Sequence, residues 1–124
     1  MNVVDSSGWL AYFADEPPAK HFNEPLTDPS SLVVPTISIY EVFKVVLRES
    51  SENEALQAVA AMQKGKVIDL TPPLAMAASK LSLAHNLPMA DSIILATARE
   101  FEAVLWTLDS DFKKVKGVKY FSKR

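Results

Sequence analysis

The sequence predicts an α/β fold, a sandwich of helices on both sides of a mostly parallel central sheet. Short apolar runs typical of buried strands alternate with longer segments typical of helices along all 124 residues. No internal repeat or long polar linker divides the chain, so we expect residues 1–124 to form a single domain. Right-handed crossovers through the helices would make neighbouring strands parallel.

The first half of the chain predicts two strands and a helical hairpin. Residues 2–4 ("NVV") are an apolar strand candidate, and the serine pair that follows can start a helix through residues 8–13. Residues 16–31 hold four of the eight prolines and predict a loop around a short helix. Residues 31–35 predict a second strand, and Thr36 is the expected N-cap of a helix over residues 37–50. Another helix over residues 52–64 follows almost directly, which predicts an antiparallel pair.

The second half continues the alternation. Gly65 ends the hairpin, residues 66–70 ("KVIDL") predict a strand, and residues 72–86 predict a helix that starts with proline. Pro88 then starts the helix that contains "LPMADSIILATA". Residues 103–109 ("AVLWTLD") form a continuous apolar run, as in parallel strands buried on both faces. A short helical turn over residues 110–115 and a strand over residues 118–121 complete the chain.

Composition excludes several classes of function. The chain has no cysteine, which excludes disulfides, thiolate metal sites and a cysteine nucleophile. It has no apolar run of about 18 residues that could span a bilayer, and Asp5 interrupts the apolar amino terminus, so we expect a cytoplasmic protein without a signal peptide or membrane partner. The net charge of −2 gives no overall basic field for nucleic acid, unless bound divalent cations supply positive charge locally.

Four acids raise a more specific question, which starts from Asp91 in the apolar and small-residue stretch of residues 87–98. A carboxylate there is costly unless something satisfies it. Asp5 and Asp109 directly follow predicted strands, Asp91 lies in the first turn of its helix, and Glu41 lies in an apolar helix. Because the carboxyl ends of parallel strands share one edge, we expect these acids to meet there.

Each acid alone also has a structural explanation, as a helix cap, a turn residue, a partner of a helix dipole or a surface charge. Together they would repel one another and raise each other's pKa unless cations neutralise them. Mg²⁺ and Mn²⁺ prefer carboxylate and water oxygens, and a pair of such ions can activate water against a phosphodiester.

Four segments, "VVDSSGWLAYF", "VPTISIYEVFKVV", "LPMADSIILATA" and "VLWTLDSDF", together resemble the PIN domain family of metal-dependent ribonucleases. The resemblance covers nearly the whole chain, its third and fourth segments are the most specific, and the compact length is similar to that of VapC type toxins of toxin–antitoxin pairs. It implies a PIN fold and an endoribonuclease that uses Mg²⁺ or Mn²⁺. The implied metal-binding acids are Asp5, Glu41, Asp91 and Asp109, with Asp111 as an auxiliary acid.

The same resemblance implies an RNA substrate, a cognate antitoxin protein and a homodimer. Ser6 and Thr107 match positions where the family carries a hydroxyl that orients the site, and Ser92 stands where alanine is common. Lys44 and Arg48 lie on the same helix face as Glu41 and either contact phosphates or an antitoxin carboxylate, or are solvated surface charges. The hairpin over residues 37–62 is where we expect the antitoxin helix to dock.

Three alternatives stay open on the sequence alone. A receiver-type phosphoacceptor domain usually has paired acids after its first strand, where this chain has only Asp5, and a haloacid dehalogenase type phosphatase needs a second Asp where Ser7 stands. A catalytically inactive PIN fold that binds RNA or regulates is the third. Other features predict no site: His21 and His85 lack ligand spacing, the two tryptophans are expected in the core, and "QKGKV" is expected to be a turn.

Overall fold

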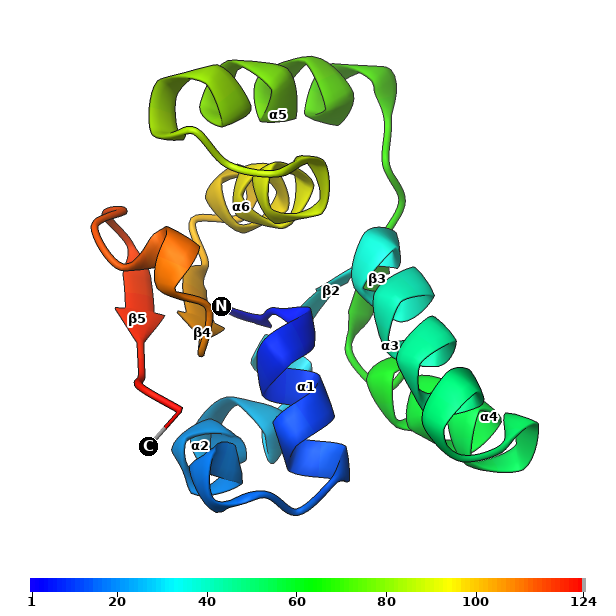
Figure 1. The fold of residues 1–124 in the computed structure, drawn as a ribbon. Coiled ribbons are helices and arrows are strands. Elements are labelled where there is room, and N and C mark those ends of the chain that lie inside the picture. Colours follow the sequence, from blue (N-terminus) through cyan, green and yellow to red (C-terminus); the bar gives the residue numbers. More distant parts are fainter. Residues whose placement is uncertain (124) are drawn as a thin grey trace.

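The structure, a computed structural model, describes residues 1–123 and confirms the α/β fold (Figure 1). Its strands are β1 (Asn2–Val4), β2 (Val33–Pro35), β3 (Lys66–Ile68), β4 (Val104–Thr107) and β5 (Val118–Tyr120). Within the described residues every strand pairing is parallel, in one sheet of order β1-β4-β5 and one of order β2-β3. A bridge between Asn2 and Leu32 sets β2 beside β1. The strands therefore follow the order β3, β2, β1, β4, β5, as a sheet with a weak join in the middle.

Helices occupy the segments between the strands. They are α1 (Ser6–Phe13), α2 (Asn23–Leu26), α3 (Thr36–Glu49), α4 (Glu52–Met62), α5 (Pro72–His85) and α6 (Met89–Glu100). The proline-rich segment expected to be a loop holds α2 between the 3-10 helices η1 (Pro17–Phe22) and η2 (Pro29–Ser31). None of the helices within residues 1–123 has the length and apolar character that crossing a membrane requires.

Side-chain alternation along the strands creates a core on each face of the sheet. Val4 of β1 packs in the cluster that contains Trp9 and Phe22, whereas its neighbour Val3 packs in the cluster that contains Ile94 and Leu95. Helix α1 therefore covers one face and α6 the other, with α5 outside α6 in Figure 1. The hairpin of α3 and α4 extends to one side. Both tryptophans are buried in the core, as expected.

Several boundaries differ by one to three residues from the sequence predictions, and two of these differences have a local cause. Thr36 is the first residue of α3 and Pro35 occupies the N-cap position, without a side-chain cap. Proline can hold this place because its own φ of −66° and ψ of 139° are those of extended backbone. The second strand begins at Val33 and not at Ser31, because Ser31 completes the 3-10 turn η2.

Candidate metal centre

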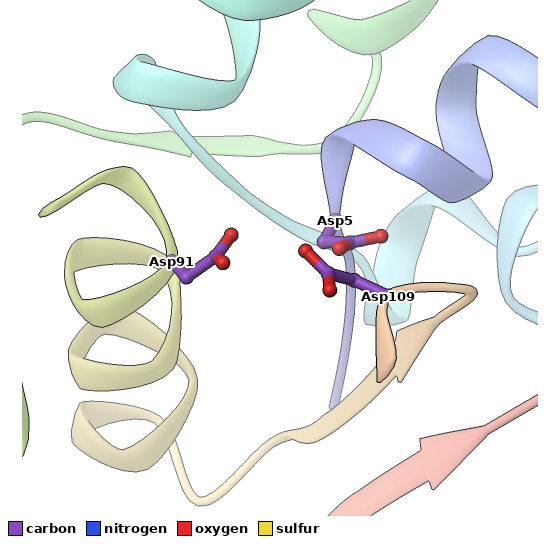
Figure 2. A group of neighbouring side chains, drawn as sticks. All are labelled: Asp5, Asp91 and Asp109. Atoms are coloured by element: carbon purple, nitrogen blue, oxygen red, sulfur yellow. The ribbon is translucent and has the colours of Figure 1, made fainter. Parts of the chain in front are cut away.

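Three aspartates from distant parts of the chain meet at the carboxyl edge of the sheet. Asp5, Asp91 and Asp109 each offer a carboxylate oxygen, and these oxygens all lie within 4.8 Å of one another. Asp5 follows β1 and Asp109 follows β4, which are neighbouring parallel strands with Val4 paired to Trp106. Figure 2 shows Asp91 reaching toward them from the first turn of α6. We call these three residues the aspartate trio.

Asp5 is the buried member of the trio, with 3% of its surface exposed. Its Oδ1 accepts hydrogen bonds from Ser7 Oγ at 2.6 Å and from the backbone N–H of Gly8 at 3.2 Å, and its Oδ2 accepts one from Thr107 Oγ1 at 2.7 Å. Burial raises the pKa of Asp5 to about 6, because desolvation outweighs the three hydrogen bonds that lower it. Asp5 is also the N-cap of α1, and in this capping position its carboxylate still belongs to the trio.

Each of the two hydroxyls that hold Asp5 accepts one hydrogen bond from the backbone and donates another to Asp5. Ser7 Oγ accepts a hydrogen bond from the backbone N–H of Leu108 at 3.0 Å, and Thr107 Oγ1 accepts one from the N–H of Asp109 at 2.8 Å. Because each hydroxyl accepts from the backbone after β4, its own proton is directed at the Asp5 carboxylate. The same hydrogen bonds fix the backbone that carries Asp109, so the geometry of two acids depends on these hydroxyls.

The pKa of Asp91 is raised further than that of Asp5. Its pKa is raised to about 7, first by desolvation and then by the negative charges of Asp109, Asp5 and Glu41. Without a cation, the trio therefore holds a proton near neutral pH. A bound divalent cation would remove both the repulsion and the need for that proton.

The spacing of the trio fits a hard divalent cation. In octahedral Mg²⁺ coordination two ligand oxygens lie about 3.0 Å apart when adjacent and about 4.2 Å apart when opposite, since each Mg–O distance is about 2.1 Å. The trio's oxygens, which all lie within 4.8 Å of one another, would need to move closer together around such an ion. The donor set is entirely oxygen, which favours Mg²⁺ or Mn²⁺ over metals that prefer sulfur or nitrogen.

The other two predicted acids lie around the trio and outside its group of mutually close oxygens. Glu41 on α3 accepts a short hydrogen bond from Ser6 Oγ, so it is held beside the start of α1, and its charge reaches Asp91. Asp111 is exposed, and its backbone N–H donates to Asp109 Oδ1 at 2.9 Å. Glu41 thus adds negative charge near Asp91, whereas Asp111 contacts the trio through its backbone.

Ser7 is the site residue that the sequence analysis did not identify. Ser6 and Thr107 were expected to orient the acids; Thr107 contacts Asp5, whereas Ser6 turns toward Glu41 on α3. A signal for Ser7 existed, because an Asp N-cap brings its side chain close to the residues two and three positions later. Gly8 occupies the last of these positions, and a Cβ atom there would lie 2.6 Å from Val4 Cγ1.

The remaining candidates have surface contacts. Lys44 Nζ lies 5.6 Å from the centre of the Tyr40 ring, and Arg48 pairs with its exposed neighbour Glu49 at 3.3 Å. His21 stacks on Phe121, with ring centres 4.4 Å apart, and His85 is exposed at the end of α5. Neither histidine belongs to the trio.

Comparison with known proteins gives a family and several structural relatives. The family model of the PIN domain matches residues 3–118. A toxin–antitoxin complex from Klebsiella pneumoniae contains a chain with a TM-score of 0.83 and 22% identity, covering 98% of this chain and 99% of that one. VapC20 of Mycobacterium tuberculosis, described as a Sarcin-Ricin loop cleaving toxin, has a TM-score of 0.78 and 19% identity, covering 94% and 95%.

A DNA-bound VapBC complex from Salmonella typhimurium also contains a similar chain, with a TM-score of 0.73 and 16% identity over the whole of both chains. A search of curated protein sequences finds no match. These structural likenesses, all at low identity, establish a shared fold. The receiver and phosphatase alternatives do not agree with this family match.

Proposed function

Since the chain belongs to the PIN domain family, we propose that it is an endoribonuclease that depends on Mg²⁺ or Mn²⁺ and hydrolyses RNA phosphodiester bonds. The observation that carries this proposal is the aspartate trio, whose three carboxylate oxygens converge within 4.8 Å. Divalent ions bound there would supply an activated water and positive charge for the leaving oxygen. The cleavage of the Sarcin-Ricin loop stated for VapC20 is consistent with an RNA substrate.

The chain's own residues position the ions and the substrate. Asp5 is fixed by Ser7 and Thr107, so its carboxylate faces the site in one orientation. Asp91 belongs to α6. Because its pKa is raised, it is the carboxylate that releases a proton when a cation binds. Glu41, which accepts a hydrogen bond from Ser6 at the start of α1, would add negative charge near a bound ion.

Replacement of single trio acids tests this function. We expect Asp5→Asn and Asp91→Asn, which keep side-chain size, to lower RNA cleavage with Mg²⁺ or Mn²⁺ by at least about 100-fold, because even partners of metal ligands are worth 10- to 100-fold. Mn²⁺ binding, followed by electron paramagnetic resonance, should weaken in parallel. Asp69→Asn is the matched control, because Asp69 also follows a strand, β3, yet is exposed and outside the trio.

The outcomes separate the candidates. Circular dichroism must show that both Asn variants keep the fold. If they cleave RNA as well as the wild type does, the trio is not the catalytic site. If the wild type binds Mn²⁺ but leaves a panel of cellular RNAs intact with either metal, the chain is an inactive PIN fold that binds or regulates.

We further propose that the chain is the toxin of a toxin–antitoxin pair. Several structural relatives come from such complexes. A cavity of about 610 Å³ between α1 and the α3–α4 hairpin has an apolar floor that includes Leu10, Phe13 and Val46, and its rim carries Glu16, Glu49 and Glu54. An amphipathic antitoxin helix with basic residues would match this floor and rim, and an antitoxin arginine could pair with the trio.

Homodimerisation is part of the same proposal. The face formed by α5 and the start of α6 exposes large apolar side chains: Met76, Leu83 and Met89 have 63%, 88% and 72% of their surface exposed. Covering such side chains with a second copy would remove apolar area from water. Sedimentation of the purified chain gives its oligomeric state. Growth arrest on expression, relieved by Asp91→Asn, would support toxicity.

A further inference from the structure

A basic segment directly follows the acidic site. Residues 112–123 contain five lysines and neither Asp nor Glu, although the whole chain has a net charge of −2. More than a third of the 13 basic residues thus lie in about a tenth of the chain. They are Lys113, Lys114, Lys116, Lys119 and Lys123. This concentration creates a local positive field that the net charge conceals.

The first two of these lysines are presented on a fixed turn. They follow the 3-10 helix η3 (Ser110–Phe112), where the N–H of Lys113 donates to the Ser110 carbonyl at 3.1 Å. Phe112 on one side and Val115 on the other are buried, at 0% and 9% exposure. Lys113 and Lys114 lie between these anchors with their side chains exposed. Their backbone is therefore held in place before any ligand binds.

Both lysines line a cavity together with Ser110, the residue that follows Asp109 of the trio. The cavity has a volume of about 290 Å³, and its other lining residues are His85, Ser110, Asp111 and Val115. Ser110 is the residue after Asp109, and a 3-10 helix rises about 2.0 Å per residue, so the Lys113 backbone lies roughly 8 Å from that of Asp109. His85 ends α5, close in sequence to the start of α6 that carries Asp91.

The two ammonium groups keep their charge available for a ligand. Across residues 1–123 the structure has one ion pair, between Arg48 and Glu49, so neither lysine is neutralised by a carboxylate. Asp111 is the one acid that lines the same cavity, and its charge disfavours an anion at its own end. An anion in the cavity would therefore lie toward Lys113 and Lys114, away from the trio and from Asp111.

We propose that this cavity binds a backbone phosphate of the RNA strand near the scissile bond, with Lys113 and Lys114 as positioning residues. The proposal rests on the proposed function in taking RNA as the ligand. Phosphate contacts by lysine fix the register of a nucleic acid without reading its sequence. The lysines would then hold the strand by one phosphate while the trio and its ions act on a neighbouring one.

The test compares RNA binding by the wild type, the Lys113→Ala/Lys114→Ala variant and a control with the same loss of charge. The control, Lys64→Ala/Arg99→Ala, removes two exposed cations at the opposite edge of the sheet, before β3 and at the end of α6. Binding of a fluorescent single-stranded RNA is followed by anisotropy in EDTA between 50 and 200 mM salt, so that no cleavage occurs. Cleavage kinetics are measured separately with Mn²⁺.

Counterion release gives the expected size of the effect. Each phosphate contact on a single strand contributes about 0.7 to the slope of log K against log salt, so losing this one phosphate site should lower the slope by about 0.7. At 0.1 M salt one such contact is worth about fivefold in affinity, so the double variant should bind about fivefold more weakly. With Mn²⁺, KM should rise by a similar factor while kcat changes little.

The results separate this proposal from the proposed function. Unchanged affinity and salt slope in the lysine variant, an equal loss in the control, or no RNA binding by the wild type would overturn the phosphate site. A wild type that binds RNA through these lysines but never cleaves it would overturn the nuclease function and leave the phosphate site standing.

Discussion

The aspartate trio makes the stability of the metal-free protein depend on pH in an unusual direction. The pKa of Asp5 is raised to about 6 and that of Asp91 to about 7, whereas an unfolded aspartate titrates near 3.8. Between these values the folded state binds more protons than the unfolded state does. The free energy of unfolding must therefore fall as pH rises through this window.

The magnitude follows from the same values. For Asp5, integration between pH 5 and pH 8 gives a loss of about 1.4 kcal/mol in the free energy of unfolding. Asp91 adds to this loss, but it is partly exposed, so solvent screening reduces its share. We expect a total decrease of about 2 to 3 kcal/mol, a large fraction of the stability of a small domain.

Urea unfolding at pH 5, 6, 7 and 8 in EDTA measures this decrease. In Asp5→Asn the decrease should be smaller by at least about 1.4 kcal/mol, because an amide does not titrate and no longer raises the pKa of Asp91, whereas Asp69→Asn should behave as the wild type does. Mg²⁺ at about 100 times its Kd should restore about 2.7 kcal/mol at pH 8. A pH profile that is flat or rising in the wild type, or identical in Asp5→Asn, would refute the electrostatic account of the trio.

Other substitutions test the support of the site. Thr107→Val removes the proton directed at Asp5 Oδ2 and the acceptor for the Asp109 N–H, so it should cost about 1–3 kcal/mol in urea unfolding and about 10- to 100-fold in Mn²⁺ affinity. Gly8→Ala places a Cβ 2.6 Å from Val4 Cγ1 and should lower stability by about 1–3 kcal/mol, which thermal unfolding would reveal; an unchanged Tm would contradict this packing. Ser92→Ala removes only a hydrogen bond to the Met89 carbonyl and should keep normal cleavage kinetics, and a loss of kcat would show that Ser92 does more than cap its turn.

Local patterns were sufficient to predict the sequence of strands and helices. Apolar runs such as that ending at Thr107 are buried on both faces, and their chemistry is visible without the fold. Boundaries were less certain where two local preferences compete. Thr36 is a good N-cap by residue type, but Pro35 already has the backbone angles of a cap, so the helix begins one residue earlier than expected.

The site was predictable to the level of elements and not to the level of contacts. Asp5 and Asp109 could be placed together because each follows a strand and the strands are parallel. The partners of neighbouring hydroxyls depend on helix phase, which rotates about 100° per residue. Ser6 therefore turns toward Glu41 while Ser7 turns back to Asp5, and of these two contacts only the second follows from the spacing of an Asp N-cap.

The net charge of the chain says little about its local charge, because it averages over opposite charges that the fold separates. The value of −2 counted against a nucleic-acid partner. In the folded chain three aspartates converge at the trio, where cations can reverse their charge, and Lys113 and Lys114 line a cavity together with Ser110, the residue after Asp109. The proposed RNA strand would need both regions, since repulsion by three carboxylates must be cancelled at the reacting phosphate while neighbouring phosphates need permanent positive charge. Metal binding should therefore strengthen RNA binding, and it should do so less in Asp91→Asn, where one of the repelling charges is already gone.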